Sequence, residues 1–222
     1  MVVRDCNFSV QKGEMIGLMG ESGSGKSTLA KLLIGLEKPS QGQVLLDGQP
    51  YSVKKSGVRI LLVFQDSLHS VNPHFTVEQV LTEALPKDVA REEIEAILED
   101  VGLDKSYLTQ PARQLSGGQL QRICIARGLL LKPDVLIFDE ALSGLDPIVQ
   151  GRLLRLLYDL WEKYQLTYLF ISHDFKLSYA LCHRILVMAD GEIVDEIKDF
   201  ELPIQAHHPV TKKLIGDKAH FS

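Results

Sequence analysis

A glycine-rich stretch at residues 20–28 (GESGSGKST) has the composition and spacing needed to bind an anion. The pattern Gly-x4-Gly-Lys-Ser is that of a phosphate-binding loop. Glycines allow successive backbone N–H groups to turn toward one anion, and the start of a following helix adds partial positive charge. Lys26 can then reach the outer phosphates of a nucleotide, and the Ser27 hydroxyl can bind Mg²⁺. We predict a nucleotide site at Gly20, Glu21, Ser22, Gly23, Ser24, Gly25, Lys26, Ser27 and Thr28.

Two adjacent carboxylates, Asp139 and Glu140, follow the apolar run 135–138 (VLIF). An acid at the end of a buried strand beside a phosphate-binding loop can hold Mg²⁺, a role that we expect for Asp139. Because successive strand residues point to opposite faces, Glu140 points elsewhere and could orient or deprotonate an attacking water. In isolation, the pair could equally end a strand in solvent. Its place after a phosphate-binding loop favours the metal site.

Residues 115–119 (LSGGQ) form the most specific string in the chain. Ser116 and the following glycines open a helix, which provides a second helix N-terminus able to bind an anion. An ordinary helix cap is the simpler explanation of these residues alone. One nucleotide does not need two such sites from one chain, so the second could serve a nucleotide bound by another subunit.

In this order, the motifs resemble those of the ATP-binding subunits of ATP-binding cassette (ABC) transporters, over about residues 3–215. The resemblance identifies 20–28 as Walker A, Gln65 as the Q-loop glutamine and 115–119 as the signature. It identifies 135–140 as Walker B and His173 as the H-loop histidine. Residues 143–146 (SGLD) match the D-loop, with Gly144 where alanine is usual. A lone Gln65 or His173 would more simply be a surface or structural residue.

The same resemblance implies how these residues act on ATP and Mg²⁺. Glu140 would be the general base, and His173 would contact the γ-phosphate, with Lys26 and Gln65 completing the catalytic set. Mg²⁺ would be bound by Ser27, Gln65 and Asp139. The γ-phosphate bound by a second ATP-binding subunit would be capped by Ser116, Gly117, Gly118 and Gln119, and Asp146 would couple the two sites.

Two further stretches resemble the oligopeptide, dipeptide and nickel importer group: 63–67 (VFQDS) with 71–73 (VNP), and 208–214 (HPVTKKL). The group implies an ATP-hydrolysing motor, peripheral on the cytoplasmic face of the membrane, that powers import of peptides, nickel or metal chelates. Its partners would be membrane permeases, an identical or different ATP-binding subunit and, indirectly, an extracytoplasmic binding protein. We expect the pair His207 and His208 to lie in a solvated turn and to bind no metal.

Other classes of nucleotide-binding protein explain less of the sequence. Non-transport ABC ATPases of translation or DNA repair usually have two cassettes or a long coiled-coil insertion. A nucleotide kinase or nucleotide-binding scaffold does not explain the signature. The family also carries an upstream aromatic residue that stacks on adenine, whereas only 19 residues precede Gly20 and we expect Phe8 to lie in the core. Either the start is trimmed or the base is held loosely.

Strand-like and helix-like segments alternate along the 222 residues, which predicts an α/β fold with a mostly parallel sheet around a P-loop core. We expect strands at 8–10 and 15–19, with those at 43–48 and 58–64 in an antiparallel accessory sheet. Thr76, with an acid in the turn after it, predicts a helix start with a threonine cap. Apolar residues at helical spacing predict a helical subdomain at about 76–131, inserted in one domain of residues 1–222. Asp190 and Gly191, between two apolar runs, predict a hairpin. Residues 200–222 form a C-terminal segment.

The bulk composition sets limits on partners and location. A net charge of −5 gives no general basic field, so we expect no nucleic-acid partner. No run approaches the roughly 18 apolar residues of a membrane span, and the first residues do not resemble a signal peptide. Three widely spaced cysteines, with no CxxC pair, predict reduced and mostly buried thiols in a cytosolic protein.

Overall fold

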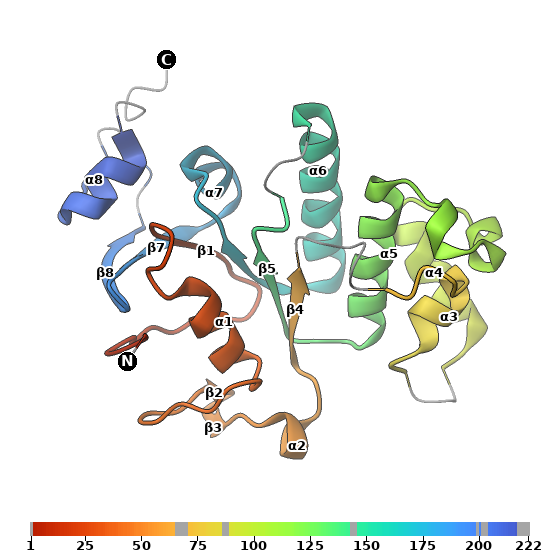
Figure 1. Ribbon diagram of the computed structural model, residues 1–222, viewed down its shortest axis with the longest axis horizontal. Helices are drawn as coiled ribbons and strands as arrows, with labels where there is room; N and C mark the ends of the chain where they lie inside the picture. Colours follow the sequence, from red (N-terminus) through yellow and green to blue (C-terminus); the bar gives the residue numbers. More distant parts are fainter. Residues whose placement is uncertain are drawn as a thin grey trace.

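A six-stranded sheet with the order β4-β5-β6-β1-β7-β8 forms the centre of the computed structural model (Figure 1), which describes residues 2–64, 71–85, 89–142, 146–198, 200 and 204–216. Neighbouring strands are parallel except β7 and β8, whose antiparallel hairpin was predicted from Asp190 and Gly191. The sheet confirms the predicted α/β class. The strands are β1 (Met15–Met19), β4 (Ile60–Phe64), β5 (Val135–Asp139), β6 (Thr167–Ile171), β7 (Arg184–Ala189) and β8 (Glu192–Ile197).

Helices cover both faces of this sheet, which explains why its strands are apolar without interruption. In β5, Leu136 and Phe138 belong to one buried cluster, whereas Ile137 belongs to the other. Helix α1 (Lys26–Leu33) packs on the face of Ile137. The opposite face is covered by α5 (Gly117–Leu130), α6 (Pro147–Tyr164) and α7 (Phe175–Leu181).

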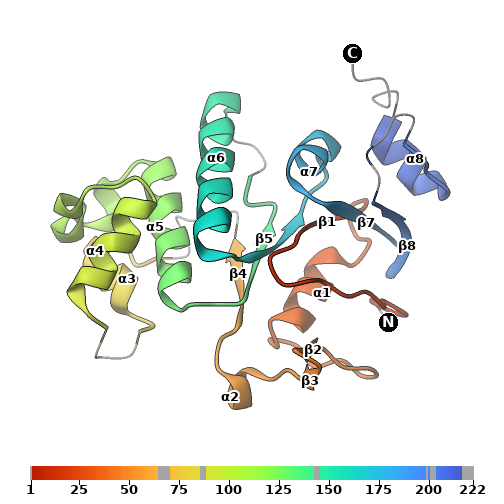
Figure 2. The ribbon, with the colours of Figure 1, turned by 180° about the vertical axis from the view of Figure 1, so that it is seen from behind.

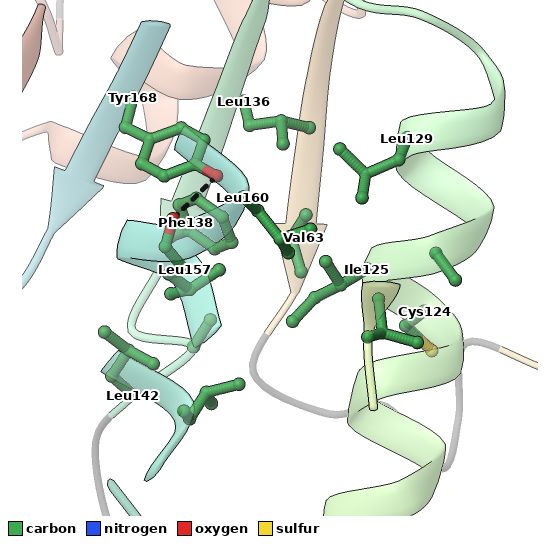
Figure 3. Close-up of a cluster of buried hydrophobic side chains, with 14 of the residues drawn as sticks. Val63, Cys124, Ile125, Leu129, Leu136, Phe138, Leu142, Leu157, Leu160 and Tyr168 are labelled. Carbon is green, nitrogen blue, oxygen red and sulfur yellow. Dashed lines mark hydrogen bonds between the residues drawn. The ribbon is translucent and has the colours of Figure 1, made fainter. Parts of the chain in front are cut away.

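A cluster of buried side chains fills the space between β4, β5, β6 and helices α5 and α6 (Figure 3). Tyr168 is fully buried, and its hydroxyl donates a hydrogen bond of 3.2 Å to the carbonyl of Leu157 in α6. Phe138 stacks on Phe170 with ring centroids 5.0 Å apart. This packing holds the carboxyl ends of β5 and β6 in a fixed relation to each other.

A group of helices lies beyond the β4 edge of the sheet (Figures 1 and 2). It contains α3 (Val77–Thr82), α4 (Arg91–Asp100) and the 3₁₀ helices Lys105–Thr109 and Ala112–Gln114, with α3 and α4 against α5. As predicted, Thr76 caps α3, and it forms a reciprocal capping box with Gln79. The division of the chain at 76–131 stays a prediction.

The predicted antiparallel accessory sheet is confirmed as a small second sheet, but the segment 58–64 that we expected in it lies elsewhere. The segment 58–64 supplies β4, which pairs in parallel with β5 in the main sheet. The second sheet consists of β2 (Leu45–Leu46) and β3 (Gln49–Pro50), which pair as an antiparallel hairpin and are followed by α2 (Val53–Ser56). The expected strand at 8–10 was wrong, because Phe8 and Val10 are half-buried against the α1-side cluster but pair with no described strand.

The C-terminal helix α8 (Pro209–Ile215) is attached to β8 by Asp195. The Asp195 carboxylate accepts hydrogen bonds from the backbone N–H of His208 at 2.8 Å and from the buried Thr211 hydroxyl. The His208 ring accepts from Val210 N–H and thereby caps α8. Among the described residues, no group of three or more His, Cys, Asp or Glu is placed to hold a metal ion.

The three cysteines are separate thiols, as the sequence predicted. Cys124 and Cys182 are buried, Cys6 is half-buried, and all three are free thiols. Burial raises the pKa of the Cys182 thiol to about 12, which keeps it protonated at neutral pH. Across the part of the chain that the structure describes, no helix is long and apolar enough to cross a membrane.

Candidate functional site

Three of the four predicted catalytic residues, Lys26, His173 and Glu140, follow the neighbouring parallel strands β1, β6 and β5. The register aligns Leu18 with Ile171, and Ile171 with Asp139, so the three strands end at the same edge. The segments that leave this edge surround a cavity of about 430 Å³, where parallel sheets commonly bind ligands. The cavity is lined by Val2, Gly20, Ser22, Gly23, Gly25, Lys26, Ser27, Thr28, Asp139, Glu140 and His173.

The loop after β1 packs closely on β7, and its glycines are required for that contact. A Cβ on Gly20 would lie 2.3 Å from the carbonyl oxygen of Met188. Gly25 has φ +108, and a Cβ there would lie 2.9 Å from the Met188 Cε and from the carbonyl oxygen of Val2. Only glycine fits these positions without displacing the backbone. The glycines therefore allow the loop to pack against β7 immediately before α1 begins.

Lys26 lies at the first residue of α1 with its ammonium group turned back over the loop. Its Nζ donates to the carbonyl oxygens of Gly20 at 2.8 Å and Glu21 at 2.9 Å. Burial lowers the pKa of Lys26, and the nearby Glu140 and Asp139 carboxylates oppose this shift. The cavity thus contains a cation facing two acids, an arrangement that suits a phosphate with its metal ion.

Asp139 and Ser27 face each other from the end of β5 and the start of α1. Burial raises the pKa of Asp139, the Ser27 hydrogen bond lowers it, and the neighbouring Glu140 raises it further. A carboxylate and a hydroxyl converging on one point are hard oxygen donors, the type that Mg²⁺ prefers. These residues therefore fit the predicted Mg²⁺ site.

Glu140 adopts a backbone conformation that is rare for a residue with a side chain. Its φ is +51, and its N–H donates to the carbonyl of Ile171 at 2.9 Å. One Oε of Glu140 lies 3.0 Å from Nδ1 of His173, which follows β6. A left-handed conformation at a non-glycine residue costs about 1–3 kcal/mol and persists where the surroundings hold it, often at functional sites. Glu140 and His173 both line the cavity.

The signature residues form a different part of the surface. Ser116, Gly118 and Gln119 line a second cavity of about 350 Å³, and none of the described residues lines both cavities. Ser116 and Gln119 form a capping box at the start of α5, and the Gln119 amide donates to the Tyr107 hydroxyl at 2.9 Å. Asp146 caps α6 by accepting from Ile148 N–H. The signature residues therefore do not face a nucleotide bound in the first cavity of the same chain. They could contact a nucleotide only if a second molecule brought one to the second cavity.

Some of the predicted site residues do not line the first cavity or are not described by the structure. Gln65 and the D-loop residues Ser143, Gly144 and Leu145 lie outside the described residues. Glu21 and Ser24 belong to the loop but do not line the cavity. The Glu21 carboxylate instead forms an ion pair of 2.5 Å with Lys213 in α8.

Val2 lines the cavity but was not predicted from the sequence. The N-terminal segment reaches it because Arg4 N–H donates to the carbonyl of Gly191, and Gly191 N–H donates to the carbonyl of Ser24. No local pattern indicates a contact between residues so far apart in the chain. Phe8 does not line the cavity and packs in the core, as expected.

Gly117 and Gly118 are not required by the fold of this chain. Neither has a positive φ, and among the residues that the structure describes a Cβ on either would have no neighbour within 4 Å. We expect Gly118→Ala to stabilise the chain by up to about 1 kcal/mol, because alanine favours a helix over glycine. Urea unfolding of both forms measures this change. Clear destabilisation would show that Gly118 has an intramolecular role, and Gly20→Ala, whose Cβ would lie 2.3 Å from the backbone carbonyl oxygen of Met188, is the destabilised control.

Comparisons with known proteins place the chain in a family. Residues 3–143 match the ABC transporter family model. The nickel import ATP-binding protein NikE of Escherichia coli O6:K15:H31 (strain 536 / UPEC) is 39% identical over 233 residues, covering 100% of this chain and 81% of NikE. The metal-staphylopine import system ATP-binding protein CntF of Staphylococcus aureus (strain NCTC 8325 / PS 47) is 38% identical over 227 residues, covering 99% and 91%.

A solved structure extends the comparison to three dimensions. The ATP-binding cassette MJ0796, in a dimeric post-hydrolysis state bound to ADP and Pi, has a TM-score of 0.73 at 26% identity, covering 89% of this chain and 90% of MJ0796. The family match spans more than half of the chain, and NikE and CntF are similar over nearly all of it. The chain therefore belongs to the ABC transporter family, as one of its ATP-binding subunits.

Proposed function

We propose that this chain hydrolyses ATP and thereby powers an importer for nickel, a metal chelate or a peptide. The observation that carries the proposal is the convergence of Lys26, Ser27, Asp139, Glu140 and His173 around one cavity. These residues supply a phosphate-binding cation, a pair of metal-binding oxygens and a carboxylate held beside an imidazole. Such a set suits phosphoryl transfer to water, in which positioning and charge stabilisation do most of the work.

Each side chain then has a distinct task. The loop N–H groups and Lys26 would bind the phosphates, and Mg²⁺ would be held by Ser27 and Asp139, with Gln65 as a further ligand. Mg²⁺ neutralises developing charge on the phosphates when it is bound. Glu140 would accept a proton from the attacking water, and His173, in contact with the γ-phosphate, would keep that carboxylate oriented.

A second ATP-binding subunit would complete the nucleotide site. The open space in front of Gly117 and Gly118 supports this arrangement, because a partner's phosphate could approach the backbone of α5 closely there. Gln119 braces this turn, and Asp146 lies at the start of the neighbouring helix α6. The dimeric, nucleotide-bound state of MJ0796 is also consistent with it. The second subunit is either a copy of this chain or a relative.

The cargo and the remaining partners are proposed from the two relatives. NikE and CntF are named for nickel import and metal-staphylopine import, which favours a metal ion or metal chelate over a peptide. The subunit would work at the cytoplasmic face of the membrane beneath permease subunits, with an extracytoplasmic binding protein delivering the cargo. We expect a membrane permease to co-purify with the tagged chain. Co-purification of ribosomes or DNA ends would instead support a non-transport ABC ATPase.

Removal of Mg²⁺ is expected to stop phosphate release from ATP while sparing much of the nucleotide binding. The loop N–H groups and Lys26 contact phosphate directly, whereas charge neutralisation during hydrolysis depends on the metal. Phosphate release is measured in excess EDTA and again after excess Mg²⁺ is added back. Asp139→Asn should raise the Mg²⁺ concentration needed for half-maximal activity. Turnover that continues in EDTA would contradict the proposed site.

A further inference from the structure

Gln121 is a buried polar residue of α5 that contacts the backbone next to Glu140. It is 6% exposed, and its Nε2 donates a hydrogen bond of 2.7 Å to the carbonyl oxygen of Ala141. A hydrogen bond from a buried amide restrains its acceptor, because leaving either group unpaired in the protein interior is destabilising. The carbonyl that Gln121 holds belongs to the residue directly after the proposed general base.

The carbonyl of Leu142, which follows Ala141, also accepts a hydrogen bond from a glutamine, but from a different helix. Gln150 of α6 donates from Nε2 to the carbonyl of Leu142 at 3.0 Å. On the other side, the Glu140 N–H is bound to Ile171 of β6. The backbone at Glu140 is therefore held by the sheet before it and by Gln121 directly after it, whereas the Gln150 bond lies one residue further along the chain. Strain of this kind persists only where such contacts enforce it.

The position of Gln121 in α5 connects this turn to the second cavity. Gln121 lies little more than one helical turn after Ser116, and both residues line that cavity. The next residue, Arg122, donates to the carbonyl of Val101 at the end of α4 at 2.8 Å. Helix α5 is thus tied to the helical group through Arg122 and to the Glu140 turn through Gln121.

From this geometry we infer that Gln121 is a positioning residue for hydrolysis, which sets the direction of the Glu140 carboxylate according to the placement of α5. The inference rests on the proposed function. The Gln121–Ala141 hydrogen bond would link two places in the chain. One is the signature, where a partner's nucleotide would bind, and the other is Glu140, the general base of this chain's own site. ATP binding to the loop after β1 does not involve this bond.

The first test compares Gln121→Met with Gln150→Met in the purified chain and in the complex with any partners that co-purify. Methionine has a similar volume but no N–H donor. For Gln121→Met we expect kcat to fall at least tenfold, with ATP affinity within about twofold of wild type. For Gln150→Met we expect a kcat within about threefold, because its bond lies one residue further from Glu140 and α6 does not carry the signature. Thermal unfolding confirms that both variants are folded.

The second test uses Gln121→Glu and the dependence of kcat on pH. An ionised glutamate cannot donate to the Ala141 carbonyl, whereas a protonated one can. Burial raises the pKa of a carboxyl group, so protonation falls within an accessible range. Relative to wild type at each pH, the kcat of Gln121→Glu should rise at least threefold from pH 8 to pH 6. The same ratio for Gln121→Met should stay constant.

The outcomes separate this inference from the proposed function. Wild-type kcat in Gln121→Met, an equal loss in Gln150→Met, or a parallel loss of ATP affinity would overturn the role of Gln121. If the variant does not fold, a flat pH ratio for Gln121→Glu overturns the role as well. A wild-type chain and complex with no Mg²⁺-dependent ATP hydrolysis would instead overturn the proposed function itself.

Discussion

Substituting glutamine for Glu140 is expected to reduce ATP turnover by about 10²–10⁴-fold, the range for loss of a general base. Glutamine keeps the size of the side chain and can retain the contact with His173, but it cannot accept a proton from water. Because Lys26 and the loop are unchanged, the variant should bind ATP with an affinity close to that of wild type. With hydrolysis blocked, the ATP-bound dimer should accumulate.

The measurement combines three readouts on the same preparation. Phosphate release gives turnover, titration with a fluorescent ATP analogue gives affinity, and size-exclusion chromatography with and without ATP gives the dimer fraction. Glu162→Gln, at an exposed position of α6 away from the cavity, is the matched control and should behave as wild type. Normal turnover in Glu140→Gln would exclude Glu140 as the base.

The second large effect is expected from Lys26→Ala, and it concerns binding of the nucleotide. Removing the ammonium group removes charge-assisted hydrogen bonds to phosphate, each worth about 1.5–3 kcal/mol. The dissociation constant for ATP should therefore increase roughly 10–100-fold. The carbonyls of Gly20 and Glu21, which accept from Lys26, also lose their partner, so the loop becomes less ordered.

Titration with the fluorescent ATP analogue checks this prediction directly. Lys31→Ala is the control, since Lys31 lies in the same helix but is exposed and does not line the cavity. Its affinity should remain within about twofold of wild type. Unchanged affinity in Lys26→Ala would contradict the assignment of this lysine to the phosphates. Together with Glu140→Gln, the two variants separate binding from hydrolysis.

The local elements of the site were predictable because their signals lie within a few residues. Gly-x4-Gly-Lys-Ser between an apolar strand and a helix specifies an anion-binding loop by backbone geometry alone. The caps at Thr76 and Ser116 depend on side chains that reach three residues ahead, and the structure contains both. Asp139 is the last residue of its strand, as the apolar run before it indicated.

Strand pairing could not be predicted from such signals. The segment 58–64 and the strand at β5 are both apolar runs, and burial on both faces leaves no alternation to show which neighbour a strand takes. The expected strand at 8–10 failed for a related reason, because alternating burial of Phe8 and Val10 does not supply a partner for backbone hydrogen bonds. The sequence pattern predicts which side chains are buried, but it does not predict which strand lies next to a given strand in the sheet.

The sequence by itself thus determined the phosphate-binding loop, the helix caps and the α/β class, since each depends on interactions between nearby residues. Only the tertiary structure decided that β1, β6 and β5 are adjacent, so that Lys26, Asp139 and His173 meet at one cavity. It also decided the contact of Val2 with the loop and the bond from Gln121 to Ala141. Such contacts arise from the packing of the whole chain, because burying apolar surface brings together residues that no local pattern connects.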